Sequence, residues 1–284
     1  MGKLIRFDWA IKKLLRNKAN FDILEGFLSA IFQDDVTVVS VLESEGNKED
    51  ETDKFNRVDL LVQNANDELI LIEVQVQAEY DFFQRLAYGA SKLITEYIEQ
   101  GQAYKEIKKV FCVGVTYFNL GAGKDYLYYG STQFVGVHEQ DTLALTEEQS
   151  EIFGTHDIQK IFPEYYLIRV EKFPDEIHEA IDEWIYMLKH SEVKPEFTAK
   201  HIQDASEKLR IMNLDEAQRK AYDAYMQNVS YKQSMLWSSR IEGKFEEKIA
   251  IARKLLTHDV AVDVIAASTG LAVDEINRLQ HTDD

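Results

Sequence analysis

Two acidic residues, Asp59 and Glu73, are the side chains in this sequence best placed to hold a metal ion together. They lie in the segment 57–77, RVDLLVQNANDELILIEVQVQ. Its two runs rich in Val, Ile and Leu are separated by the polar residues 64–67, a pattern that predicts two strands joined as a hairpin. Because both acids lie far from that turn, we expect them to face each other across the strand pair.

Such a pair indicates a particular chemistry. Two carboxylates and one backbone carbonyl, for which Val74 is the candidate, suit Mg²⁺, and Mn²⁺ or Ca²⁺ would accept the same oxygen ligands. A bound divalent cation polarises a phosphoryl oxygen and lowers the pKa of a bound water, which predicts phosphodiester hydrolysis. The alternative is that both acids are ordinary solvent-facing positions on a half-exposed sheet.

The order of these residues resembles a known signature. Asp59, a second strand and then Glu73-Val74-Gln75 are similar to the D...ExK pattern of the PD-(D/E)xK nuclease superfamily, with Gln75 at the usual lysine. Two further segments, FDWAIKKLL at 7–15 and QRLAYGASKLITEYIEQGQAYKEIKKVFCVGV at 84–115, resemble its recombination-promoting nuclease and transposase family. The resemblance covers roughly the first 170 residues.

The resemblance implies a restriction-endonuclease-like α/β fold and a role for each matching residue. Asp59 and Glu73 would be metal ligands, and Gln75 would occupy the third catalytic position. Four further positions match family elements outside the hairpin: Asp8 and Lys12 in an N-terminal D-x-x-x-K element, and Arg85 and Tyr88 on the helix after the ExQ strand.

Gln75 departs from the signature in a way that matters physically. An ammonium offsets developing negative charge, whereas an amide only donates and accepts hydrogen bonds. We therefore expect another cation at the site, and Lys12 and Arg85 are the candidates; the alternative is that both are ordinary surface charges. Glu25 in the N-terminal helical region is a candidate additional ligand, as helix acids are in some superfamily members.

The overall charge opposes a simple DNA-binding interpretation. Against 50 Asp and Glu residues there are 32 Lys and Arg, and the formal net charge of −18 repels phosphate. Basic residues nevertheless gather in two places: Lys3, Arg6, Lys12, Lys13, Arg16 and Lys18 near the N-terminus, and Lys105, Lys108 and Lys109 further along. Either cluster could dock a nucleic-acid backbone, or both could be solvated faces without a partner.

Composition predicts a folded cytoplasmic protein. The chain has 284 residues, of which 45% are hydrophobic, enough for a substantial core. Its single cysteine, Cys112, lies in the apolar run VFCVGV, so we interpret it as a buried strand residue and expect no disulfide. No secretory segment or membrane-spanning stretch is recognisable. The histidines have no zinc-site spacing.

Periodicity predicts the elements that position these residues. Helical spacing covers 7–32 and 80–99, and strands are expected at 36–42, 109–117, 126–129, 134–138 and 164–170, with a charged loop at 46–54. This alternation favours a mixed α/β sheet flanked by helices. Residues 119–125, NLGAGKD, lack the first glycine and the final Ser or Thr of a nucleotide phosphate loop, so Gly121 and Gly123 are interpreted as a turn.

After about residue 171 the pattern becomes helical and strand signals almost vanish. We therefore predict a nuclease-like α/β domain at 1–170 and a helical region at 171–284. Residues 244–280 resemble a small helix-turn-helix, but its last helix, VDEINRLQ, offers one Arg against two acids, which makes major-groove reading doubtful. Helical packing or self-association is the alternative, and it predicts a homodimer through this region.

Two functions follow from the pattern. The first is a metal-dependent DNA endonuclease associated with recombination or transposition. The second is a catalytically inactive nuclease-fold module that binds DNA or protein, which Gln75 and the acidic charge balance favour. Close approach of Asp59 and Glu73 would support the first function, whereas carboxylates that point apart would support the second.

Overall fold

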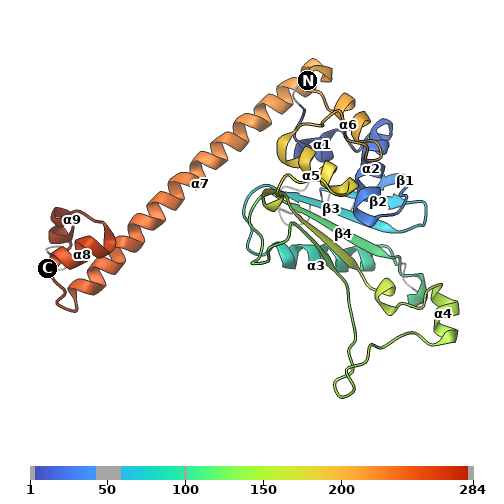
Figure 1. The fold of residues 1–284 in the computed structure, drawn as a ribbon, viewed down its shortest axis with the longest axis horizontal. Helices are drawn as coiled ribbons and strands as arrows, with labels where there is room; N and C mark the ends of the chain where they lie inside the picture. Colours follow the sequence, from blue (N-terminus) through green and yellow to red (C-terminus); the bar gives the residue numbers. More distant parts are fainter. Residues whose placement is uncertain (1–3, 43–58, 99–100, 281–284) are drawn as a thin grey trace. The chain divides into compact units, whose positions relative to one another are not determined.

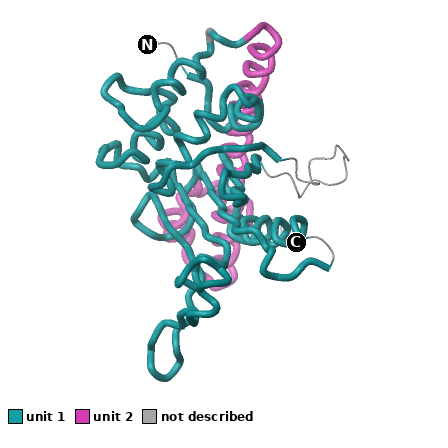
Figure 2. The backbone as a smooth tube through the Cα atoms, turned by 90° about the vertical axis from the view of Figure 1, so that its right-hand side faces the viewer, with its two compact units in different colours: residues 1–214 teal, residues 215–284 magenta. Residues whose placement is uncertain are grey.

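The computed structural model describes residues 4–42, 59–98 and 101–280. The chain divides into two compact units, Met1–Leu214 and Asp215–Asp284, which Figure 2 distinguishes by colour. The predicted charged loop at 46–54 and Lys3 of the N-terminal basic cluster lie outside the described residues.

A mixed six-stranded sheet forms the centre of the first unit. Its strands lie in the order β1-β2-β3-β4-β6-β5. Their bounds are Val38–Leu42 (β1), Leu60–Asn64 (β2), Leu69–Gln75 (β3), Val110–Thr116 (β4), Leu127–Gly130 (β5) and Glu164–Arg169 (β6). Strands β3, β4 and β6 are parallel, and the remaining pairs are antiparallel. The predicted hairpin and the predicted mixed α/β fold are both confirmed.

Helices cover both faces of this sheet (Figure 1). Helix α3 (Phe82–Glu96) joins β3 to β4, as a parallel connection requires, and lies on one face. Its Gly89 faces the Leu71 side chain of β3 so closely that an added methyl would meet it at 2.7 Å. On the other face lie α1 (Phe7–Lys13), α2 (Phe21–Phe32), α5 (Ala180–His190) and α6 (Ile202–Lys208).

The helical region predicted at 7–32 is divided into α1 and α2. Asparagine side chains explain the break, because they hydrogen-bond locally to the backbone and compete with helical hydrogen bonds. Asn17 Oδ1 accepts from the Ala19 N–H at 3.0 Å, and Asn20 Nδ2 donates to the Leu14 carbonyl at 2.9 Å. A short 3₁₀ turn, Lys18–Asn20, connects the two helices.

The strand predicted at 134–138 is wrong. Val135 forms only an isolated bridge with Thr142, and no strand is assigned to this segment. Val135 and Val137 are largely exposed, so their β-branched side chains have no covered face to pack on. The surrounding excursion instead carries α4 (Glu147–Phe153). Further short 3₁₀ segments in the described part of the chain are Tyr104–Glu106, Ile158–Ile161, Val170–Lys172 and Ile211–Asn213.

The first unit extends past residue 170, where the sequence predicts the helical region to begin. Helices α5 and α6 pack on α2, and the rings of Phe27 and Trp184 meet edge to face with centroids 5.8 Å apart. Trp184 is fully buried. Because these helices complete the core beside α2, the compact unit ends at Leu214.

Up to residue 280, where the described part of the chain ends, the second unit consists of one long helix and two short ones. Helix α7 (Glu216–Leu256) begins with a capping box between Asp215 and Gln218. Helices α8 (Val262–Thr269) and α9 (Val273–Gln280) pack on its C-terminal part around buried Ala252, Ile265, Leu271 and Ile276. Within the described residues, no helix has both the length and the apolar character needed to cross a membrane.

Candidate active site

Asp59 and Glu73 lie side by side at one end of the β2–β3 hairpin. Leu60 pairs with Ile72 in antiparallel register, so the next pair outward is Asp59 with Glu73. The Val74 N–H donates a 2.8 Å hydrogen bond to Asp59 Oδ2, which holds the Asp59 carboxylate against β3. Arg16 Nη2 binds the Asp59 carbonyl at 2.8 Å and fixes the backbone at the same point.

Both acids are buried, which excludes the solvent-facing alternative. Asp59 is 8% exposed and Glu73 is 4% exposed. Burial, followed by the neighbouring charge of Asp59, raises the pKa of Glu73 to about 8. The positive charges of Arg85 and Lys12 act in the opposite direction but do not cancel the rise. The ionised form of Glu73 is therefore disfavoured in the folded protein, and a further positive charge nearby would stabilise it.

Two cations reach this pair from helices on opposite faces of the sheet. Lys12 Nζ, from α1, lies 3.0 Å from Asp59 Oδ1. Arg85 Nη2, from α3, lies 2.7 Å from Glu73 Oε2, and its Nη1 lies 3.3 Å from Glu79. Burial lowers the pKa of Arg85, but the surrounding carboxylates outweigh burial and raise that pKa overall. Both residues proposed to offset the missing lysine thus contact the acidic pair.

The main-chain groups of Val74 point to the β2 side of β3, the side on which Asp59 lies. The Gln75 carbonyl accepts from Tyr117 N, and Leu69 N donates to the Lys109 carbonyl, so odd-numbered residues bond toward β4. Main-chain groups of successive strand residues alternate in direction, so those of Val74 point toward the β2 side, where its N–H meets Asp59. Gln75 lies on the same face as Glu73 and is half-buried.

The donor set fits a hard divalent cation. Carboxylate oxygens of Asp59 and Glu73 and the carbonyl of Val74 are all oxygen ligands, which Mg²⁺ and similar ions prefer. Burial, and after it the charge of Asp59, raises the pKa of Glu73, so a cation bound beside the pair would favour the ionised form of this carboxyl group. Lys12 and Arg85 each contact one carboxylate, so an ion would share the acidic pair with these two side chains.

The structure does not bring every predicted residue to this centre. Glu25 Oε1 accepts a hydrogen bond from the Val38 N–H, and Val38 pairs with Asn64 at the opposite end of β2. At about 3.4 Å per residue, the backbone of Asn64 lies roughly 17 Å from that of Asp59, so Glu25 is remote from the acidic pair. Tyr88 lies one turn beyond Arg85 on α3 and is 54% exposed.

Asp8 is buried on α1 and contacts a neighbouring arginine instead of the acidic pair. Its Oδ1 lies 3.1 Å from Arg6 Nε, and the Arg6 guanidinium stacks 5.4 Å from the Tyr117 ring centroid. Of the D-x-x-x-K element, only Lys12 contacts Asp59 in the described structure.

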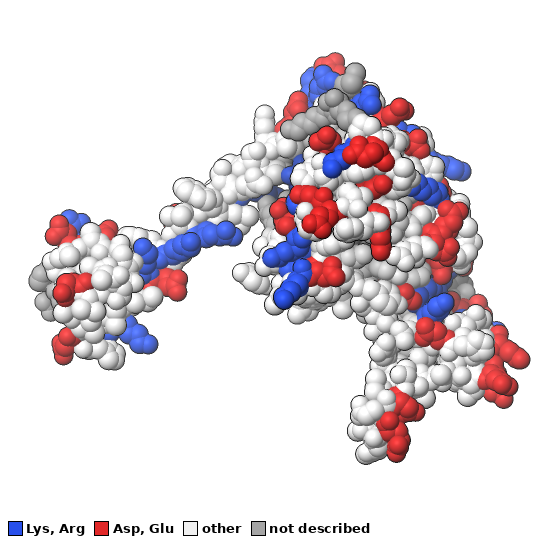
Figure 3. Space-filling model, in the orientation of Figure 1, with Lys and Arg blue, Asp and Glu red and all other residues white. Residues whose placement is uncertain are grey.

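Arg16 is a contributor that the sequence identifies only as part of a basic cluster. No local signal could reveal its contact with the Asp59 carbonyl, because the two residues are 43 positions apart. The second basic cluster is neutralised by acids: Lys105, Lys108 and Lys109 pair with Glu106, Asp67 and Glu164. On the face of the first unit drawn in Figure 3, acidic and basic side chains are interspersed.

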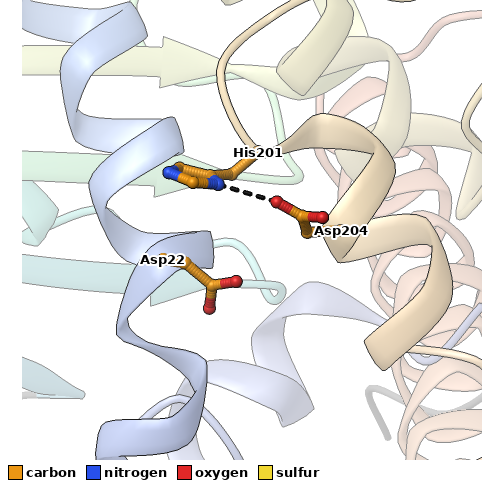
Figure 4. A group of neighbouring side chains, drawn as sticks. All are labelled: Asp22, His201 and Asp204. Carbon is orange, nitrogen blue, oxygen red and sulfur yellow. Dashed lines mark hydrogen bonds and ion pairs between the residues drawn. The ribbon is translucent and has the colours of Figure 1, made fainter.

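A second group of potential ligands, which the sequence analysis missed, lies between α2 and α6 (Figure 4). Within the described part of the chain, Asp22, His201 and Asp204 offer ligand atoms within 4.8 Å of one another. However, in contrast to the buried pair of Asp59 and Glu73, this group is half-exposed to exposed, and both Asp22 carboxylate oxygens bind Lys208 Nζ, at 2.8 and 2.7 Å. We interpret this group as an ionic contact between helices. The three-residue spacing of His201 and Asp204 was its only local signal.

Comparison with known proteins identifies one family. A family model described as PD-(D/E)XK nuclease family transposase matches residues 5–238. The match includes both acids, both contacting cations and the beginning of α7. No match was found among curated proteins or among solved structures.

Proposed function

The chain belongs to the PD-(D/E)XK nuclease transposase family, and from that premise we propose that it is a metal-dependent DNA endonuclease acting in transposition or recombination. The observation that carries the proposal is that Asp59 and Glu73, both buried, lie side by side at one end of the β2–β3 hairpin, with the Asp59 carboxylate held against β3 by the Val74 N–H. Family membership makes DNA the expected substrate.

In the proposed mechanism, Asp59, Glu73 and the Val74 carbonyl hold the ion, with Mg²⁺ as the expected species. When bound, a divalent ion polarises a phosphoryl oxygen and lowers the pKa of a coordinated water. Lys12 and Arg85 orient the two carboxylates and stabilise negative charge that develops on the phosphate. Gln75 orients the attacking water or a phosphate oxygen by hydrogen bonding.

Cleavage of supercoiled plasmid tests this function. The unmodified protein is compared with Asp59→Asn and Glu73→Gln in Mg²⁺, Mn²⁺ and chelator, after circular dichroism has shown equal folding. Asp67→Asn is the matched control, because Asp67 is an exposed acid at the turn of the same hairpin. We expect metal-dependent cutting by the unmodified protein and the control, and loss of cutting in both site variants.

The other outcomes have definite meanings. Cutting that persists in Asp59→Asn and Glu73→Gln would remove the acidic pair from the mechanism. DNA binding without cutting in any metal would favour the non-catalytic module. The ion pairs of Lys12 with Asp59 and of Arg85 with Glu73 also favour this alternative, because they balance the two carboxylates without a metal.

A further inference from the structure

Arg169, at the end of β6, is a buried cation whose guanidinium contacts neutral oxygens of a neighbouring loop. It is 2% exposed. Its Nη atoms donate to the carbonyls of Gly123 (2.7 Å), Asp125 (3.1 Å) and Gly121 (3.3 Å) and to Asn119 Oδ1 (2.5 Å). It forms no ion pair with a carboxylate of the described residues, and its buried Nε lacks a hydrogen-bond partner there. A buried charge without a counter-ion is costly, so this arrangement favours an anion nearby.

The way Arg169 holds the loop 119–125 determines what the loop presents outward. In a trans peptide the C=O and the following N–H point in opposite directions. Because the Gly121 and Gly123 carbonyls point inward to Arg169, the N–H groups of Ala122 and Lys124 point away from it. Neither N–H has a hydrogen-bond partner among the described residues, and the exposed Lys124 side chain forms no ion pair there.

This loop lies at the same edge of the sheet as the acidic pair. Strands β3, β4 and β6 are parallel, and Gln75, Thr116 and Arg169 are paired neighbours at their C-terminal ends. With strands about 4.8 Å apart, the Arg169 backbone lies roughly 10 Å from that of Gln75. Each strand of B-DNA carries one phosphate per about 3.4 Å of helix axis, so a backbone at the acidic pair has other phosphates within reach of the loop.

We propose that loop 119–125 is a phosphate-binding surface that holds the DNA backbone beside the cleavage site. The outward N–H groups of Ala122 and Lys124 and the Lys124 ammonium contact a backbone phosphate, and the buried charge of Arg169 strengthens that contact through the loop. The loop is not a nucleotide phosphate loop, because strand β5 follows it where such a loop would open a helix. The inference rests on the proposed function for its substrate.

Salt-dependent DNA binding tests this surface. Full-length protein is titrated into a fluorescein-labelled DNA duplex in Ca²⁺ at 50–200 mM salt, for the unmodified chain and Lys124→Ala. Each phosphate contact contributes about 0.9 to the slope of log K against log salt. We therefore expect the slope to fall by about 0.9, so that affinity changes about 3.5-fold less across this range, equally for duplexes of unrelated sequence.

Lys105→Ala is the control, because exposed Lys105 precedes β4 and so lies at the opposite end of that strand. A slope that falls with Lys124→Ala and not with Lys105→Ala supports the loop. An unchanged slope with Lys124→Ala overturns it, even if the plasmid assay shows metal-dependent cutting. A reduced slope in a protein that does not cut would retain the phosphate surface while rejecting the nuclease.

Discussion

Gln75 shows how the surroundings of one residue change its chemical consequences. An amide cannot supply the charge that a lysine would at this position, yet two cations lie within 3.0 Å of the neighbouring carboxylates. Lys12 approaches Asp59 from one layer of helices and Arg85 approaches Glu73 from the other. The charge absent from the third signature position is therefore present in the site, supplied by side chains from separate helices.

Two substitutions test whether Lys12 supplies the charge that a lysine at position 75 would supply. If Lys12 stabilises the transition state, Lys12→Ala lowers kcat for plasmid cleavage by about 10²-fold or more, since removing one such donor has effects of this size. Adding Gln75→Lys to Lys12→Ala should recover part of the loss. Single-turnover cleavage with saturating metal measures both variants. A double variant no faster than Lys12→Ala would show that the two positions are not equivalent.

Glu73 makes the stability of the metal-free protein depend on pH. Its pKa is about 8 in the folded state against a usual 4.5, so between these values the folded state holds a proton that the unfolded chain has released. The contribution of Glu73 to the free energy of unfolding is therefore fully present below pH 4.5 and decreases as the pH rises toward 8. Relative to Glu73→Gln, whose amide does not titrate, the unmodified protein should lose on the order of 3 kcal/mol across this interval.

Urea unfolding in chelator at pH 5, 6.5 and 8 measures this difference. Arg85 stays charged throughout the interval, so its altered contact in Glu73→Gln shifts all three values equally. A difference between the two proteins that stays constant with pH would show that the pKa of Glu73 is not raised.

Among the helices, α2 and α7 each contain a glycine, and the space around these two glycines differs. Gly26 on α2 faces α5 and the chain before α6: an added methyl would collide with the Lys200 carbonyl and lie 2.7 Å from Trp184 Cζ2. Gly243, within α7, has open space around the position of a methyl. The first glycine is required by packing, whereas the second only lowers helix propensity.

Alanine substitutions at the two glycines should therefore have opposite effects. Gly26→Ala forces α2 away from its neighbours and should destabilise the first unit by about 2 kcal/mol or more. Gly243→Ala should stabilise α7 by up to about 1 kcal/mol. Native-state hydrogen exchange measures the protection of amides in α2 and in α7, and so determines the two effects separately. Equal protection of α2 in Gly26→Ala and the unmodified protein would refute the close packing.

At the scale of the whole molecule, the candidate centre lies within one unit. Asp59, Glu73 and their contacting cations belong to the first unit, while the second has its own core around Ile265. Helix α7 exposes several large apolar side chains, among them Tyr231, Met235 and Trp237. The expected homodimer through this region stays a prediction, and sedimentation equilibrium would test it.

Disrupting the core of the second unit tests how far catalysis depends on it. Ile265→Asp places a charge in a fully buried position and should unfold α8 and α9, which lowers the helix signal in circular dichroism. Val264→Asp, at a half-exposed neighbouring position, is the control. We expect both variants to cut plasmid at the unmodified rate. Loss of cutting in Ile265→Asp alone would show that the second unit contributes to the reaction.

The sequence by itself determined the features that depend on neighbouring residues. Two runs rich in Val, Ile and Leu around a polar turn predicted the β2–β3 hairpin, and the position of both acids far from that turn predicted that Asp59 lies opposite Glu73. Helical spacing predicted α3 for the same local reason. The resemblance carried by Asp59, Glu73 and Gln75 led to the family that the match over residues 5–238 confirms.

Only the tertiary structure decided which distant groups meet and how deeply the acids are buried. The contact of Arg16 with Asp59 joins residues 43 positions apart, and that of Arg169 with Gly123 joins residues 46 apart. Neither has a local pattern. Likewise, α5 joined the first unit because Trp184 packs on α2, which helical periodicity cannot specify. Burial depends on packing between layers, and burial is the leading cause of the raised pKa of Glu73.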